Sequence, residues 1–137
     1  MKKENWVSAL EKEIVRYQTA PFKWGENDCL IFVADCIKAM TDFDFMEPWR
    51  GKYTNEDEAA SLMIEHWNGK INRGWDPVAS PIDNHKAQRG DFGTLQYTGK
   101  TYCGVVSLNA RFLLVRTEEG IARLKLKNVD RLSLWRA

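Results

Sequence analysis

Histidine is scarce in this chain: His66 and His85 are the only two among its 137 residues. Because imidazole is the general base that enzymes use most often, this scarcity limits the acid–base chemistry open to the protein. The charges almost cancel, with 20 Lys and Arg against 19 Asp and Glu. A formal net charge of +1 disfavours electrostatic capture of nucleic acid, so we expect no nucleic-acid partner.

The sequence also lacks long apolar runs and an even number of cysteines. No apolar run approaches the ~20 residues that a membrane-spanning helix requires, so we expect no membrane partner. The three cysteines are an odd number, and no basic leader with an apolar stretch opens the sequence. Both features indicate an unsecreted protein in a reducing compartment. The cysteines and histidines show no close ligand spacing, so we expect neither a metal nor a cofactor.

The length fits a single domain over residues 1–137, and its N-terminal half is predicted to be helical. Apolar residues recur at three- and four-residue steps from residue 4 to 18, which predicts an amphipathic helix that Pro21 ends. A third helix is expected at residues 55–67, opened by a capping box of Thr54 and Asp57.

Between these two lies the most informative segment, a run from Leu30 to Met40 that is apolar around most of a helix. Such a helix is buried on nearly all sides. Asp28 precedes it as N-cap, which places Cys29 in the first turn. A thiol there faces the positive end of the helix dipole and unpaired N–H groups, an environment that favours nucleophilic cysteines. Burial as a small apolar residue is the alternative interpretation.

The C-terminal half changes to the two-residue period of strands. A loop rich in Gly, Pro, Asn and Asp runs from residue 68 to 91, and its length makes it a candidate functional segment. Strands are expected at residues 92–97, 101–108, 111–117, 121–127 and 132–136. Helices followed by strands predict an α+β fold, with N-terminal helices packed on a mostly antiparallel sheet of five or six strands.

Five short motifs between residues 22 and 136 form a combination typical of one protein family. They are Phe22-x-Trp24-Gly25-x-x-Asp28-Cys29, Arg50-Gly51-x-Tyr53-Thr54, Arg89-Gly90-Asp91, Cys103-Gly104-Val105-Val106 and Leu134-Trp135-Arg136. This combination resembles the NlpC/P60-like superfamily of papain-fold proteins. More narrowly, it is similar to a small family that tailed phages and prophages encode, often beside tail-tip genes. The resemblance covers residues 20–137 as a papain-like core and leaves residues 1–19 as an extra N-terminal helix.

The resemblance also implies an active site. In NlpC/P60 enzymes a helix-borne Cys is the nucleophile, a His at the start of a strand is its base, and a polar residue on the next strand orients the His. Cys29 matches the nucleophile, whether working or vestigial. Tyr102 or Cys103 stands where the His should be, and the third position falls near residues 113–115. The base and its partner are therefore missing from their places, and His85 in the long loop is the alternative base.

Four neighbours of the cysteine are candidate contacts for a substrate: Trp24, Gly25, Asp28 and Tyr53. Each also has a structural interpretation. The glycine is free to take positive φ at a sharp entry to the helix, with the tryptophan as a wall of the cleft. N-capping alone explains the aspartate. Tyr53 would pin the loop between the second and third helices.

Three functions remain open. The first is a non-catalytic structural or assembly component of a phage or prophage tail tip, a pseudoenzyme made in the bacterial cytoplasm and carried in the virion tail. Its partners would be other tail-tip proteins, with peptidoglycan peptide as a further one. The second is an active cysteine peptidase that cleaves peptidoglycan stem peptides with Cys29 as nucleophile. The third is a peptide or small-ligand binding module whose cleft surrounds Trp24. The missing histidine favours the first over the second, because proton transfer contributes ~100- to 10,000-fold to such reactions.

The same alignment makes a geometric prediction. Nucleophile and base face each other across a papain-like cleft, so Cys29 and Cys103 should be the nearest pair of cysteines, with Cys36 turned away. In a reducing cytoplasm both remain thiols, whereas oxidation after lysis would link them.

Overall fold

The N-terminal half of the chain forms the three helices that its apolar spacing predicts. The computed structural model describes all residues, 1–137. Helix α1 spans Trp6–Thr19 and ends two residues before Pro21. Helix α2 spans Cys29–Thr41 and buries most of its apolar side chains completely. Helix α3 spans Glu56–Trp67. None of the helices combines the length and the apolar character needed to cross a bilayer.

The start of α3 differs by one residue from the predicted capping box. Asn55, not Thr54, is the N-cap, and its side chain accepts a hydrogen bond from the backbone N–H of Glu58 at 2.8 Å. The Glu58 carboxylate reaches back and accepts from the backbone N–H of Thr54 at 2.8 Å. Asn caps a helix at least as well as Thr, and Glu is the usual acid at the third helical position, so the box shifts to these residues.

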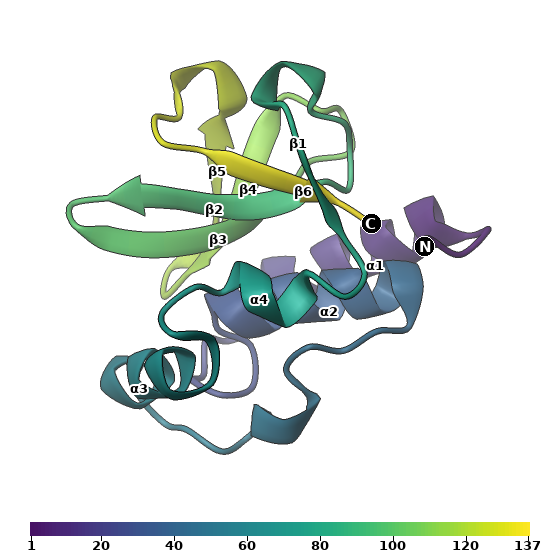
Figure 1. Cartoon of the computed structure of the whole chain (residues 1–137). Helices are drawn as coiled ribbons and strands as arrows, with labels where there is room; N and C mark the ends of the chain where they lie inside the picture. The colour runs from purple at the N-terminus through teal and green to yellow at the C-terminus, as the bar shows by residue number, and fades with distance from the viewer.

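The five predicted strands are confirmed, and a sixth joins them in one sheet (Figure 1). The strands are β1 (Ser80–Ile82), β2 (Phe92–Tyr97), β3 (Lys100–Val106), β4 (Phe112–Thr117), β5 (Gly120–Lys125) and β6 (Ser133–Arg136). Their order is β1-β6-β2-β3-β4-β5, and every neighbouring pair is antiparallel. Thr98 and Gly99, both at positive φ, make the two-residue turn between β2 and β3. The α+β class with an antiparallel sheet is thus confirmed.

The segment predicted to be one long loop is more ordered than expected. It contains helix α4 (Asn72–Trp75), strand β1 and a 3-10 turn, η2 (Asn84–Lys86). Two further 3-10 turns, η1 (Glu47–Trp49) and η3 (Leu126–Asn128), lie elsewhere in the chain. These elements are too short to show a period, and Pro81 within β1 is tolerated because β1 is an edge strand.

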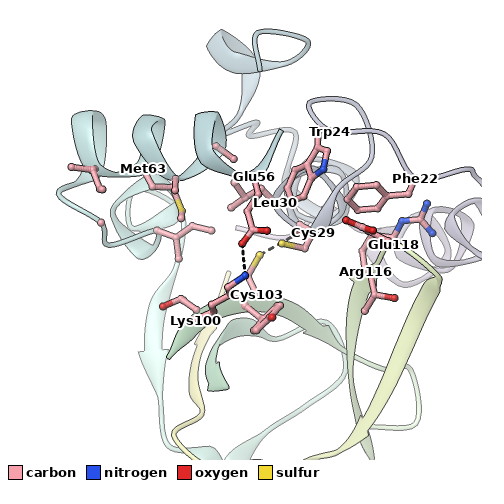
Figure 2. A pocket seen from close by; sticks show the side chains of 18 of the residues that line it. Phe22, Trp24, Cys29, Leu30, Glu56, Met63, Lys100, Cys103, Arg116 and Glu118 are labelled. Carbon is pink, nitrogen blue, oxygen red and sulfur yellow. Dashed lines mark hydrogen bonds and ion pairs between the residues drawn. The ribbon is translucent and has the colours of Figure 1, made fainter. Parts of the chain in front are cut away.

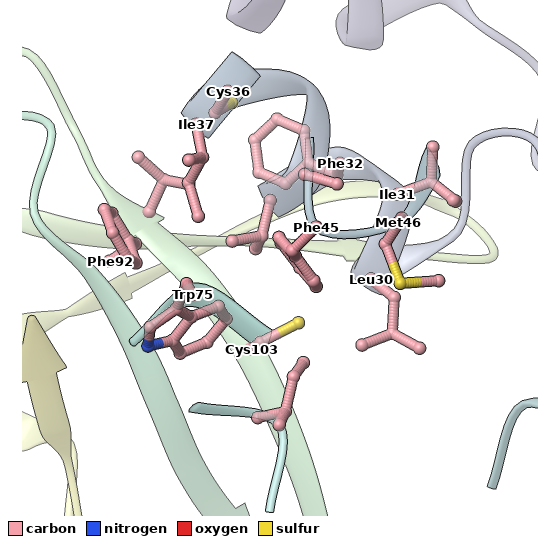
Figure 3. Packing of buried hydrophobic residues seen from close by; sticks show 14 of the residues in the cluster. Leu30, Ile31, Phe32, Cys36, Ile37, Phe45, Met46, Trp75, Phe92 and Cys103 are labelled. Carbon is pink, nitrogen blue, oxygen red and sulfur yellow. The ribbon is translucent and has the colours of Figure 1, made fainter. Parts of the chain in front are cut away.

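The helices cover one face of the sheet, and the main core lies between them (Figure 1). Figure 3 shows the apolar side chains of α2 meeting Trp75 of α4 and Phe92 and Cys103 of the sheet. Alternation along the strands sends Leu113 and Val115 to a second, smaller cluster, which does not share the main core. Cys103 and Leu114 belong to the main core.

Helix α1, which the family resemblance left outside the core, packs on α2 as expected. Leu10 and Tyr17 are completely buried in this contact. The Tyr17 hydroxyl donates to Asp35 of α2 at 2.5 Å, and the same carboxylate pairs with Arg16 at 2.8 Å and Arg50 at 2.7 Å. One carboxylate therefore ties α1, α2 and the segment after η1 together.

An ion pair between Asp91 and Arg136 joins the turn before β2 to β6, near the C-terminus. Asp91 is completely buried, and both of its carboxylate oxygens accept from Arg136 at 2.9 Å. The carboxylate also accepts from the backbone N–H of Gln88 at 2.7 Å, which fixes the turn before β2. The resemblance motifs at residues 89–91 and 134–136 therefore meet in one structural contact.

We expect Asp91→Ala to lower the free energy of unfolding by about 3 kcal/mol, because it leaves a partly buried guanidinium and a turn N–H without their acceptor. Urea denaturation followed by tryptophan fluorescence measures this. The matched control is Glu26→Ala, which removes a carboxylate paired with Lys23 on the surface and should change stability little. Equal effects of both substitutions would contradict the assignment.

Candidate functional site

The start of α2 is fixed by one buried carboxylate. Asp28 is completely buried, and its Oδ1 accepts from the backbone N–H of Ile31 at 3.0 Å, as an N-cap should. Its Oδ2 accepts from the backbone N–H of Gly25 at 2.7 Å and from the hydroxyl of Tyr53 at 2.6 Å. These contacts make Cys29 the first residue of α2, as predicted.

Gly25 is required at the turn that leads into the helix. Its φ is +82°, a region that favours glycine, and a Cβ there would lie 2.4 Å from the backbone oxygen of Tyr53. The backbone N–H of Gly51 also donates to the Gly25 carbonyl at 2.8 Å. The chain around residue 51 therefore packs directly against this turn.

Cys103 of β3 lies against Cys29. Its thiol is 2% exposed and donates to the backbone carbonyl of Cys29 at 3.3 Å. Figure 2 shows the two sulfur atoms close together, and a hydrogen bond with the Cys29 side chain, together with burial, raises the pKa of the Cys103 thiol. Cys36 sits two turns further along α2, where burial raises its pKa and the nearby charges are those of Glu13, Arg16 and Asp35. Cys103 thus contacts Cys29, as the alignment predicts, and all three cysteines are free thiols.

A cavity of about 640 Å³ opens above this pair of thiols. Helix α3 forms one wall, the β2–β3 hairpin a second, and the chain before α2 a third (Figure 2). Most of the lining is apolar or aromatic, from Phe22, Trp24, Leu30, Ala59, Ala60, Met63, Ile64, Ile71 and Tyr102. Such a surface suits an apolar ligand or peptide segment.

Two exposed charged residues of the cavity lining form an ion pair. Glu56 at the start of α3 pairs with Lys100 of the hairpin, Oε1 to Nζ 2.9 Å, and links two walls. Both side chains are more than half exposed, so the pair contributes little to stability. The ion pair between Glu56 and Lys100 can therefore break with little loss of folding stability.

Arg116 of β4 is the one charged side chain of the cavity that is buried. It is 4% exposed and has no carboxylate partner. Its guanidinium donates instead to three backbone carbonyls, those of Ala20 at 2.6 Å, Asn27 at 3.1 Å and Tyr17 at 3.5 Å. Two of these acceptors belong to the C-terminal end of α1, where the helix dipole is negative and stabilises a cation.

Arg116 lies near the third site position that the resemblance implies. Residues 113–115 do not line the cavity: Leu114 is in the main core, and Leu113 and Val115 are in the second cluster. Continuing the β3–β4 register from the pair Val105 and Leu114 puts Arg116 beside Cys103. The signal was present in the sequence, because a lone Arg two positions after Leu114 shares its face of the strand. A guanidinium stays charged and accepts no proton, so this residue is not a base.

The alternative base is not at the site. His85 is exposed on η2 and absent from the cavity lining. The turn is held by Asp83, which caps it, and by Asn84, whose side chain donates to the Leu132 carbonyl at 2.7 Å. His66 is also exposed, and its ring stacks at 4.7 Å on that of Trp49. No histidine lines the cavity, and no cluster of His, Cys, Asp or Glu is placed to hold a metal ion.

Of the four candidate substrate contacts, only Trp24 lines the cavity, where its ring packs edge-on against that of Phe22 at 5.0 Å. Gly25, Asp28 and Tyr53 are buried and do not line the cavity, so a contact of theirs with a substrate stays a prediction. They hold the start of α2. The sequence could not separate these roles, because both place the residues next to the cysteine.

Comparison with known proteins places the whole chain in one family. The model of a family described as a domain of unknown function, DUF6950, matches residues 1–137. A search of curated proteins finds no match to the chain.

Loss of the Tyr53 hydroxyl should destabilise the fold. In Tyr53→Phe the buried Asp28 carboxylate loses one of its three donors, so we expect the free energy of unfolding to fall by about 1.5 to 3 kcal/mol. Tyr97→Phe is the control, because Tyr97 is 65% exposed. Chemical denaturation of both variants tests the role, and an unchanged stability of Tyr53→Phe would refute it.

Proposed function

Because the chain belongs over its whole length to DUF6950, a family of unknown function, we propose its function from the geometry of the cavity. We propose that it is a non-catalytic, NlpC/P60-like component of a phage or prophage tail tip. In this proposal the cavity above Cys29 binds an apolar segment of a neighbouring tail protein.

The arrangement of elements supports the NlpC/P60-like part. A cysteine opens a buried helix, the helix packs on an antiparallel sheet, and a residue of the sheet faces the thiol. Four of the five motifs of the resemblance also gather in two structural contacts. One joins the turn before Cys29 to Tyr53 through Asp28, and the other joins Asp91 to Arg136.

One observation carries the non-catalytic part: Cys103 occupies the place beside Cys29, and no histidine reaches it. A thiol peptidase needs a group that accepts the thiol proton and returns it to the leaving amine. The buried Cys103 thiol has a raised pKa, and Arg116 keeps its charge, so neither performs this transfer near neutral pH. The loss amounts to ~100- to 10,000-fold in rate.

The cavity lining supports a binding role. Ile64 is 65% exposed at the mouth, and Met63 and Trp24 are half-buried along the walls. Apolar side chains gathered around an open cavity gain free energy when a partner covers them. The resemblance to proteins encoded beside tail-tip genes makes other tail-tip proteins the proposed partners and the virion the proposed location.

A second candidate function is an active cysteine peptidase that acts on peptidoglycan stem peptides. The observation in its favour is that Cys29 is only partly buried, faces the cavity and opens a helix. Helix N-termini and partial exposure are typical of reactive cysteines.

Incubation with purified peptidoglycan separates the two. We expect the wild-type protein to release no soluble peptides above the level of Cys29→Ala, because no group near the thiol transfers its proton. Chromatography of the released peptides is the measurement. Release that Cys29→Ala abolishes would overturn the non-catalytic proposal and establish the second candidate.

Complementation of a phage that lacks the gene tests the binding role. We expect tail assembly to be restored by wild-type protein and by Cys29→Ala, but not by Ile64→Glu, which puts a charge at the mouth of the cavity. Ser61→Glu is the matched control on α3, since Ser61 lies outside the cavity lining. The measurement is the yield of tailed, infectious particles relative to soluble variant protein. Full yield with Ile64→Glu, or none with Cys29→Ala, would contradict the proposal.

A further inference from the structure

We propose that Cys29 and Cys103 form a thiol–disulfide exchange site, in which a small disulfide entering the cavity oxidises the pair to an internal disulfide. This inference stands apart from the proposed function, because it follows from the placement of the two thiols alone.

The two cysteines have different access to solvent. Both cysteines line the cavity, but Cys29 is partly exposed whereas Cys103 is only 2% exposed. They come from α2 and β3, 74 residues apart in the chain. A reagent in the cavity therefore meets Cys29 first, and Cys103 is positioned to complete the reaction.

The contact between the thiols suits bond formation. The Cys103 sulfur lies 3.3 Å from the carbonyl oxygen of Cys29, so the thiol of one residue touches the backbone of the other. A disulfide requires Cβ atoms about 3.5 to 4.5 Å apart, and two residues already in contact need little movement of the backbone to reach that separation. The third cysteine, Cys36, is completely buried, lies outside the cavity and has no such neighbour.

The exchange proceeds in two balanced steps. The Cys29 thiolate attacks one sulfur of the small disulfide, and a mixed disulfide forms as the first small thiolate leaves. The Cys103 thiolate then attacks the Cys29 sulfur, the internal disulfide forms, and the second small thiolate leaves. The pair loses two electrons and two protons, and the small disulfide is reduced to two thiols. Because burial keeps Cys103 protonated near neutral pH, the second step should accelerate as the pH rises.

The product is a covalent link between helix and sheet. It closes a loop that includes α3 and the turn of the β2–β3 hairpin, which belong to two walls of the cavity. Oxidation would thus fix the floor of the cavity and remove its only accessible thiol.

The test uses full-length protein, oxidised glutathione as the small disulfide, and mass spectrometry of unreduced peptides. We expect a peptide pair that joins Cys29 to Cys103, with free thiols falling from three to one. Cys103→Ser should accumulate glutathione on Cys29, because nothing resolves the mixed disulfide. Cys29→Ser should take up none, and Cys36→Ala should form the internal disulfide like wild type.

Two results would overturn the proposal. One is wild-type protein that keeps glutathione on Cys29 and forms no internal disulfide, which would show that Cys103 does not reach the mixed disulfide. The other is wild-type protein that retains all three thiols. Since both readings come from the wild-type chain, they hold even where a variant folds poorly, and circular dichroism of each variant identifies such a case.

Discussion

The buried carboxylate of Asp28 is the interaction on which the site depends. A charged group without water is costly unless donors surround it. Three donors do so here, the N–H groups of Gly25 and Ile31 and the hydroxyl of Tyr53, and the N-terminus of α2 adds its positive dipole. Each donor comes from a different piece of the chain. The carboxylate thereby joins the entry turn, the helix and the segment before α3, and all three must be in place before Cys29 reaches the cavity.

Arg116 of β4 holds the segment that leads into α2 from the side of the sheet. Its guanidinium binds carbonyls at the end of α1 and just before Asp28, so residues 20–28 lie between a buried cation and a buried anion. Backbone carbonyls satisfy Arg116, whereas two backbone N–H groups and the Tyr53 hydroxyl satisfy Asp28. The contacts of Arg116 act on the chain itself and hold the backbone of these residues in place. The wall formed by Trp24 is therefore set by the fold, and a ligand meets a largely formed cavity.

The sequence predicted the parts of this arrangement that depend on local signals. The apolar run after Asp28 is long enough to define α2, its cap and the place of Cys29, and alternation defines the strands from residue 92 onward. The rest depends on tertiary contacts. Helix α4 and strand β1 are too short to show a period. The roles of Tyr53 and Arg116 appear only when groups distant in the sequence come within hydrogen-bond reach. The position of His85 is set in part by its neighbour Asn84, which bonds the carbonyl of Leu132 just before β6.

The structural roles of Gly25 and Asp28 shift the functional argument to other residues. Positive φ at Gly25 and a buried charge at Asp28 are features that often mark active sites. Here the fold accounts for both, because they are what starting α2 at residue 29 requires. The residues that the fold does not account for are those that contribute least to burial, such as Ile64 at the mouth of the cavity and the partly exposed Cys29 at its floor. An apolar side chain left in water adds little to stability. The functional argument therefore rests on the open lining of the cavity and on its thiol pair, and the framework around them explains only how they are held in place.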